Sequence, residues 1–199
     1  MTRDELHELG YIAPIATVPS ILELGILSHN RAKKVDHRDI ALQEVQDRRA
    51  KVIVPAPGGG RRLHDYANVY ICPHNPMLLK KKAIHDEICV LRVSPAVLDI
   101  PGAVVTDMNA GSDYVHFSAA PGGLATVNRD RTFADWWTHP DPRDKWRHSA
   151  QKCAEVLVPN VIPSKLITGA YVRGEAARDA LEAVAPLLAV TINKHLFFQ

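Results

Sequence analysis

One carboxylate stands inside an otherwise apolar segment of this chain, Ala154-Glu155-Val156-Leu157-Val158. Because side chains alternate along a strand, we expect Ala154, Val156 and Val158 on one face and Glu155 with Leu157 on the other. A carboxylate is an unfavourable choice for the middle of a strand. If the first face packs on the core, Glu155 points into whatever the opposite face lines, which makes it a candidate site residue. The alternatives are a solvated edge residue or a partner for a nearby arginine.

A second candidate is the arginine pair Arg48-Arg49, which is followed by Lys51 and by a Pro/Gly-rich loop over residues 55–60. The planar fork of donors on arginine suits a pyrophosphate or a carboxylate. The same charges are also typical of a solvated helix face, which this motif alone does not exclude.

Two further segments combine polar and aromatic residues. Ser28-His29-Asn30 follows the first expected helix, and residues 63–78 contain Tyr70, two histidines and two prolines. A histidine in such a turn is commonly structural, and a tyrosine in a strand commonly packs across the sheet. A tyrosine ring can also stack on a flat ring such as nicotinamide.

The length, charge and amino-acid composition of the chain exclude several classes of protein. The chain has 199 residues, a net charge of +2 and 46% hydrophobic residues, which predicts one globular domain over residues 1–199. The small charge excludes a strongly basic nucleic-acid coat. Three cysteines without CxxC spacing indicate no zinc site, so we expect no metal. Sparse thiols, a polar N-terminus and no apolar run of about 18 residues predict a cytoplasmic protein without a membrane span.

The elements that must position these residues form an α+β pattern. A helix is expected after Thr17, with Pro19 in its first turn and Gly25 at its end. A second helix is expected over residues 175–188 and a partly helical segment over 38–50. Residues 119–150 combine Gly, Pro and three tryptophans, which is typical of a long functional loop with a short helix. Strands are expected at 11–16, 67–71, 87–95, 103–107, 114–117, 154–158, 166–172 and 189–198.

Five segments, in order and at similar spacing, resemble the DarT family, the toxin half of DarT–DarG systems. The resemblance runs from about residue 11 to about residue 185. It rests on "SILELGILSHN", "VQDRRAKVIVPAPGGG", "LHDYANVYICPHNPML", the Thr106-Asp107 step and "RHSAQKCAEVLVPNVIP".

The resemblance implies an ADP-ribosyltransferase fold, with split antiparallel β-sheets, flanking helices and NAD in the cleft. It implies transfer of ADP-ribose from NAD to a thymidine or guanosine base in single-stranded DNA, with release of nicotinamide and a DarG-like antitoxin as partner. The implied catalytic residues are Glu155 and Arg49. The implied NAD-binding residues are Tyr11, Ala13, His29, Asn30, Arg49 and Tyr70. The implied DNA-binding residues are Arg48, His74, Met77, Arg129 and Arg147, with residues 119–150 as the substrate loop.

The chain departs from the family pattern at two positions. Tyr11 stands where relatives carry a histidine that helps to hold NAD, although a tyrosine hydroxyl can also donate to a ribose oxygen. His74 stands where relatives can carry arginine. The rival functions are a transferase of the same fold acting on RNA or protein, a non-catalytic NAD-binding module, and an unrelated DNA-binding module.

Overall fold

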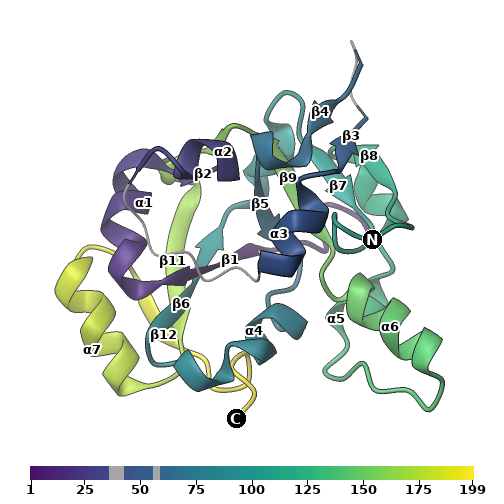
Figure 1. The fold of residues 1–199 in the computed structure, drawn as a ribbon. Helices are drawn as coiled ribbons and strands as arrows, with labels where there is room; N and C mark the ends of the chain where they lie inside the picture. The colour runs from purple at the N-terminus through teal and green to yellow at the C-terminus, as the bar shows by residue number, and fades with distance from the viewer. Residues whose placement is uncertain (36–42, 56–58) are drawn as a thin grey trace.

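The computed structural model describes residues 1–35, 43–55 and 59–199 (Figure 1). Eight strands form one sheet, and two short strand pairs accompany it. The strands are β1 Leu9–Pro14, β2 Ile26–Leu27, β3 Ile53–Val54, β4 Arg61–Arg62, β5 Tyr66–Tyr70, β6 Ile88–Val93, β7 Val104–Thr106, β8 Phe117–Ala119, β9 Glu155–Pro159, β10 Val161–Ile162, β11 Ile167–Val172 and β12 Val190–Ile192. The α-helices are α1 Val18–Leu24, α2 His29–Ala32, α3 Gln43–Arg49, α4 Pro76–Lys80, α5 Arg129–Phe133, α6 Pro142–Gln151 and α7 Glu175–Val184. Short 3₁₀ turns are η1 Ile15–Thr17, η2 Leu63–Asp65, η3 Lys82–Ile84, η4 Pro95–Asp99, η5 Gly122–Thr126 and η6 Ser164–Leu166.

The large sheet has the strand order β12-β11-β6-β1-β5-β9-β7-β8. Its neighbouring strands run antiparallel except β11 and β12, which run parallel. Strands β1 and β5 join the two halves of the sheet, and their pairing consists of Gly10 opposite Tyr70. The sheet is therefore split at its middle, and the α+β class predicted from the sequence is confirmed.

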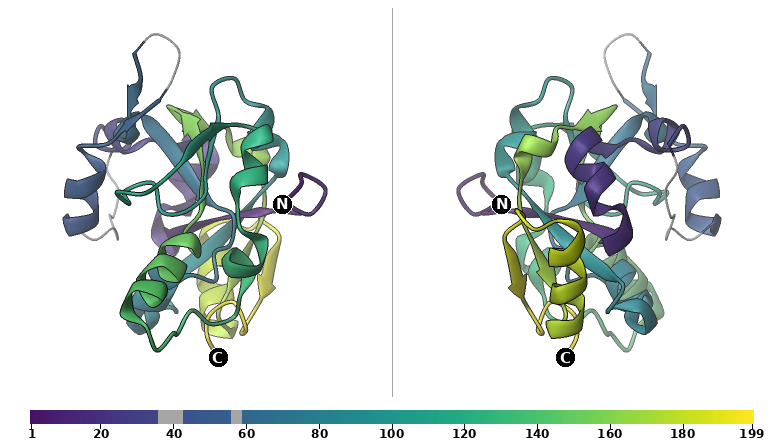
Figure 2. Two further views of the ribbon diagram at one scale, coloured as in Figure 1. Left: turned by 90° about the vertical axis from the view of Figure 1, so that its right-hand side faces the viewer. Right: turned by 90° about the vertical axis from the view of Figure 1, so that its left-hand side faces the viewer.

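Alternation along β1, β6 and β11 sends side chains to two cores. Ala13, Leu91 and Ala170 pack with the buried face of α7, whereas Ile12 and Val90 pack with Leu78 of α4 and Phe197 of the C-terminal turn, among other residues. Figure 2 shows α1 and α7 next to each other on one side of the sheet, and Figure 1 shows α5 and α6 at the opposite end of the molecule. Each face of this half of the sheet is thus covered by apolar side chains.

The first helix has the predicted boundaries. Thr17 is the N-cap residue of α1, although its hydroxyl donates to the Pro14 carbonyl rather than accepting from the helix. Gly25 ends the helix with a φ of 83°, and a Cβ atom there would lie 2.4 Å from the Ile162 carbonyl oxygen. Only glycine fits, because the β2–β10 pair approaches the backbone so closely.

Several predicted elements differ from the structure. The expected C-terminal strand over residues 189–198 is only Val190–Ile192, because Asn193 accepts from the Leu196 N–H and starts a turn. The expected strand at 114–117 lies at Phe117–Ala119, and the helix expected over 175–188 ends at Val184, before Pro186. Residues 119–150 contain η5, α5 and most of α6 rather than one short helix. Part of the predicted helical segment at 38–50 and part of the Pro/Gly loop lie outside the described residues.

The cysteines are free and buried. Burial raises the pKa of both Cys89 and Cys153 to about 12, so their thiols stay protonated near neutral pH. Within the described residues, no helix is both long and apolar enough to cross a membrane.

Candidate active site

Glu155 is the first residue of β9, an interior strand between β5 and β7. Ala154, Val156 and Val158 join one core cluster and Leu157 joins another, which confirms the predicted alternation of faces. The side chain of Glu155 is 0% exposed. The solvated-edge alternative is therefore wrong, and the carboxylate needs partners inside the protein.

Arg49, the last residue of α3, is the principal partner of Glu155. Its Nη1 donates to Oε1 at 2.9 Å and its Nη2 donates to Oε2 at 3.2 Å. Burial alone would lower the pKa of the Arg49 guanidinium, but the charge of Glu155 and the hydrogen bonds to it raise the pKa above its ordinary value. The two residues therefore form a buried, bidentate ion pair.

Two neighbours on the same side of the sheet fix the Glu155 carboxylate and backbone. The Ala110 N–H donates to Oε1 at 3.0 Å. The Thr106 hydroxyl accepts from the Glu155 N–H at 3.0 Å and lies 3.3 Å from the Glu155 carbonyl oxygen, to which it donates. A carboxylate has about four acceptor positions, and three of them are used by Arg49 and Ala110. Among the described residues, the remaining position, on Oε2, has no donor.

Tyr70 lies directly across the β5–β9 pair from Glu155. Burial and the charges of Glu155 and other neighbours raise the pKa of its hydroxyl well above the ordinary value, so Tyr70 stays protonated and can donate. Tyr11, on the adjoining strand β1, is among these neighbours. Ala13 is also on β1, but its side chain is buried in the core with α7, so only its backbone can serve a ligand.

His29 and Asn30 begin α2 and contact the turn η2. The His29 and His64 rings lie 4.1 Å apart, and Asn30 Nδ2 donates to Asp65 at 2.7 Å. Burial, together with the neighbouring charges, lowers the pKa of His64 to about 4, so His64 is neutral at pH 7. The buried His64 Nε2 and Ser28 Oγ atoms have no hydrogen-bond partner within the described part of the chain. This corner therefore presents polar atoms suited to a ligand.

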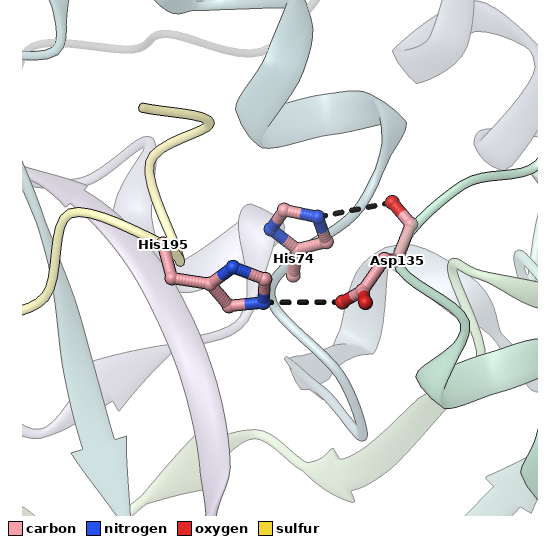
Figure 3. Close-up of side chains that lie close together, drawn as sticks. All are labelled: His74, Asp135 and His195. Carbon is pink, nitrogen blue, oxygen red and sulfur yellow. Dashed lines mark hydrogen bonds and ion pairs between the residues drawn. The ribbon is translucent and has the colours of Figure 1, made fainter.

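The predicted DNA-binding residues separate into two groups. Arg48 and Arg147 are exposed. Arg129 is also largely exposed, but it pairs with Glu5 at 3.4 Å. His74 is buried against Phe198 and His195, and its Nδ1 lies next to the Leu196 carbonyl oxygen. Its Nε2 lies next to the Asp135 carbonyl oxygen (Figure 3). The structure thus places His74 inside the protein.

Met77 and the three tryptophans also divide into buried and exposed residues. Met77 packs partly against the core of α4. Of the tryptophans, Trp137 is buried, whereas Trp136 and Trp146 are exposed.

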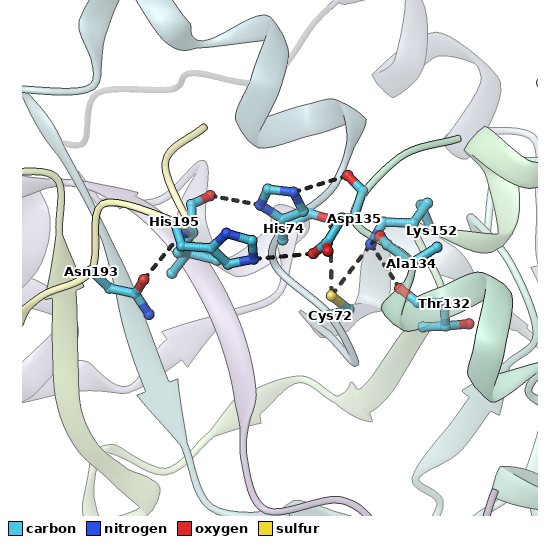
Figure 4. A network of polar contacts seen from close by, with 9 residues as sticks. Cys72, His74, Thr132, Ala134, Asp135, Lys152, Asn193 and His195 are labelled. Carbon is cyan, nitrogen blue, oxygen red and sulfur yellow. Dashed lines mark hydrogen bonds and ion pairs between the residues drawn. The ribbon is translucent and has the colours of Figure 1, made fainter. Parts of the chain in front are cut away.

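The sequence did not single out Lys152, which is fully buried three residues before Glu155. Its Nζ donates to the carbonyl oxygens of Thr132 at 2.9 Å and Ala134 at 2.7 Å, and lies 3.6 Å from Cys72 Sγ (Figure 4). Burial lowers the pKa of this ammonium group. Lys152 ties the segment between α5 and α6 to the strand that carries Glu155. Its sequence neighbours, Gln151 and Cys153, give no distinctive pattern that marks it as buried.

We expect Thr106→Val to lower the free energy of unfolding by about 1–3 kcal/mol, because the buried Glu155 N–H loses its acceptor. Urea denaturation measures this loss. Thr106→Ser keeps the hydroxyl and should lose less than Thr106→Val. Equal losses for the two variants would show that the methyl group, rather than the hydrogen bond, carries the effect.

Comparisons with known proteins identify the family of this chain. The sequence model of the family described as "ssDNA thymidine ADP-ribosyltransferase, DarT" matches residues 11–198. A DNA ADP-ribosyl transferase of Thermus sp. (strain 2.9) is 31% identical over 177 residues, which cover 83% of this chain and 81% of the relative. A DNA ADP-ribosyl transferase-DNA ADP-ribosyl glycohydrolase fusion protein of Thermosipho africanus (strain H17ap60334) is 27% identical over 190 residues, covering 89% of this chain and 46% of the relative.

Solved structures extend the likeness to the whole fold. Thermus sp. 2.9 DarT in complex with ADP-ribosylated ssDNA superposes with a TM-score of 0.85 at 25% identity, covering 100% of this chain and 99% of that chain. Thermus sp. 2.9 DarT in complex with NAD+ gives a TM-score of 0.78 at 24% identity, with 98% of each chain covered. The ADP-ribosyltransferase fold implied by the sequence is confirmed. The chain belongs to the DarT family of single-stranded-DNA thymidine ADP-ribosyltransferases.

Proposed function

We propose that Glu155 and Arg49 form the centre at which this DNA ADP-ribosyltransferase moves ADP-ribose from NAD⁺ to thymidine in single-stranded DNA. The observation that carries the proposal is the buried bidentate pair between the two residues, with one acceptor position of Glu155 left over. Of the two bases that the sequence left open, thymidine is the one in the family description.

The transfer of ADP-ribose requires a carboxylate at this position. The bond between nicotinamide and the ribose C1′ breaks, and nicotinamide leaves with the bonding electrons as a neutral molecule. The ribose carbon then has oxocarbenium character, which the negative charge of Glu155 stabilises. The only ring N–H of thymidine is at N3. As N3 bonds to C1′, its proton passes to Oε2 of Glu155, the oxygen with an unused acceptor position.

Arg49 holds the Glu155 carboxylate in a fixed orientation before the base arrives. Its two N–H groups bind both carboxylate oxygens, so the remaining acceptor position of Oε2 has a defined direction. The guanidinium also favours the anionic form of the thymine ring as the proton leaves. Arg49 therefore acts on the reacting groups through charge as well as through geometry.

The NAD⁺-binding part of the proposal uses the corner between β1, α2 and η2. His29 and Asn30 supply donors and acceptors there, together with the polar atoms of Ser28 and His64 that have no partner among the described residues. Tyr70 supplies a ring and a protonated hydroxyl beside Glu155. Tyr11 and the Ala13 backbone border the same half of the sheet. These groups fit a ribose and a nicotinamide better than they fit a metal ion.

An exposed aromatic pair supports the DNA-binding part. Tyr114 and Trp146 are 70% and 48% exposed, and their rings contact edge to face at 6.0 Å. Both residues lie on segments linked to Glu155. Trp146 is on α6, whose Ala150 carbonyl oxygen accepts from the Asn109 N–H. Tyr114 follows Ala110 in the same loop, and the Ala110 N–H donates to Glu155. With Arg147 on the same helix, the pair offers stacking and charge to a single strand.

We expect Trp146→Ala to raise the KM for a single-stranded oligonucleotide by roughly 5- to 100-fold, the equivalent of one lost base-stacking contact. The KM for NAD⁺ should change little. Steady-state kinetics with each substrate varied in turn separates the two constants. Leu187→Ala, at an exposed position beyond α7, is the control and should alter neither. A larger change in the KM for NAD⁺ than in that for DNA would contradict the assignment.

The choice of base and of proton can be tested with oligonucleotides that differ at one position. An oligonucleotide with thymidine at that position and no other thymidine should gain one ADP-ribosyl group in the presence of NAD⁺, and its counterparts with guanosine or with N3-methylthymidine there should gain none. Mass spectrometry reads out the adduct. Equal modification of the N3-methylated base would overturn the proposed proton transfer to Glu155.

We also propose that a DarG-like protein is the partner that counteracts this activity, so that the chain acts as a toxin. The Thermosipho africanus relative carries a transferase and a glycohydrolase in one fusion protein. A glycohydrolase would restore the thymidine by hydrolysing its bond to ADP-ribose, which releases free ADP-ribose.

A further inference from the structure

Three side chains from distant parts of the sequence meet beside α4. His74 follows β5, Asp135 lies between α5 and α6, and His195 lies in the turn after β12 (Figure 3). One potential metal-ligand atom of each residue lies within 4.8 Å of the other two. Among the residues that the structure describes, they are the one such group of three formed by histidine, cysteine, aspartate or glutamate.

The two imidazoles present the same nitrogen to Asp135. Their rings are stacked, with centroids 5.1 Å apart and planes 6° from parallel. Nε2 of His195 lies 3.1 Å from the Asp135 carboxylate, and Nε2 of His74 lies 3.2 Å from the Asp135 carbonyl oxygen. Figure 3 shows both nitrogens directed to this one residue. The arrangement gathers two nitrogen donors and a carboxylate on one side of the ring stack.

The two ring nitrogens of His74 each lie near a carbonyl oxygen, and a neutral ring can donate to only one of them. Nδ1 lies 3.1 Å from the Leu196 carbonyl oxygen, and the tautomer with its single N–H there leaves Nε2 without a proton. The lone pair of Nε2 then faces the lone pairs of the Asp135 carbonyl oxygen, and the two repel. A metal ion bound to Nε2 would replace this repulsion by two favourable contacts.

We propose that His74, Asp135 and His195 form a binding site for a divalent transition-metal ion, with Zn²⁺ the best-suited ion. Imidazole nitrogen and carboxylate oxygen are ligands that zinc prefers. The contact from Nδ1 of His74 to a backbone carbonyl is the support that metal-binding histidines usually have. A position beyond the three protein ligands is left for water or for the Asp135 carbonyl oxygen.

The spacing fits an ion after a small adjustment. Bonds of about 2.0–2.1 Å in a tetrahedral site place neighbouring ligand atoms about 3.3 Å apart. In the structure, the three candidate ligand atoms lie within 4.8 Å of one another. The side chains of His195 and Asp135 are 73% and 63% exposed, so both can rotate toward the ion while the buried His74 stays in place.

Such an ion would add a further link among three segments that already meet through the rings of His74, His195 and Phe198 and the His195–Asp135 contact. Lys152 already holds the Thr132 and Ala134 carbonyl oxygens, immediately before Asp135 (Figure 4). The ion would add the C-terminal turn to the same network and so brace the segment that carries Trp136. Neither Glu155 nor Arg49 belongs to the site, so its test is independent of the proposed catalytic centre.

The test uses the full chain after treatment with a chelator, titrated with Co²⁺ and then with Zn²⁺. We expect one Co²⁺ per chain with visible absorption bands, displacement of Co²⁺ by Zn²⁺, and a Tm about 5–10 °C higher at a zinc concentration one hundred times the Kd. His195→Gln and Asp135→Asn change exposed side chains, and circular dichroism confirms their fold. Each should weaken binding by more than about 100-fold, since even the loss of a supporting contact costs 10- to 100-fold.

Two control variants address the other histidine pairs. His116→Gln removes the exposed pair with Asp107 and should leave binding unchanged. His139→Gln removes the contact of 2.7 Å with His148 and should also leave it unchanged. The proposal is overturned if the chain shows no saturable binding, if binding survives in His195→Gln and Asp135→Asn, or if His139→Gln abolishes it.

Discussion

Glu155→Gln is expected to lower the kcat for ADP-ribose transfer to DNA by about 10²–10⁴-fold or more. A positioned general base contributes about this factor, and the loss of its negative charge beside the oxocarbenium ion adds to it. Glutamine has nearly the same shape as glutamate, so the KM for NAD⁺ should change far less than kcat. Steady-state kinetics on a single-stranded oligonucleotide measures both constants.

The matched control for this substitution is Glu23→Gln, on the exposed side of α1, which should keep the activity of the parent. Circular dichroism and NAD⁺ binding must show that Glu155→Gln is folded, because the substitution leaves the Arg49 charge buried without its counterion. A folded Glu155→Gln protein with the kcat of the parent would remove Glu155 from the mechanism.

Arg49→Ala is expected to lower the free energy of unfolding by about 3–5 kcal/mol, because it leaves the fully buried Glu155 carboxylate without its cation. In a chain of this length the Tm should fall by roughly 6–20 °C. Transfer to DNA should be lost as well. Arg49→Lys keeps a charge but not the two parallel hydrogen bonds, so it should recover stability more fully than activity.

A double-mutant cycle isolates the pair itself. The variant Arg49→Ala with Glu155→Ala removes both charges, so it should be more stable than the sum of the two single losses implies, by about 1–3 kcal/mol. It should nevertheless be inactive. Strictly additive losses would mean that the two side chains do not interact as the structure has them, and activity in the double variant would contradict the catalytic assignment.

The local part of this architecture could be predicted from the sequence. Period-two alternation placed Ala154, Val156 and Val158 on one face of a strand and Glu155 on the other. Gly25 marked the end of α1 through its left-handed backbone. Both features depend on neighbours within a few residues, which is the range over which a sequence pattern carries information.

The long-range part could not be derived from patterns. Arg49 and Glu155 are 106 positions apart, and their approach depends on how α3 packs against the split sheet. The family resemblance named both residues but not their direct pairing. The contacts from Ala110 and Thr106 use a backbone N–H and a hydroxyl, which have no distinctive spacing. The placement of His74 inside the protein depends on the C-terminal turn, where the sequence predicted a continued strand.

The central claim is that this chain transfers ADP-ribose from NAD⁺ to thymidine in single-stranded DNA through Glu155. The most direct measurement is mass spectrometry of a single-thymidine oligonucleotide after incubation with NAD⁺, with released nicotinamide quantified in the same reaction. We predict one ADP-ribosyl group on the thymidine for each nicotinamide released by the parent protein, and no adduct with Glu155→Gln. Nicotinamide release without a DNA adduct, or an adduct formed equally by Glu155→Gln, would contradict the account.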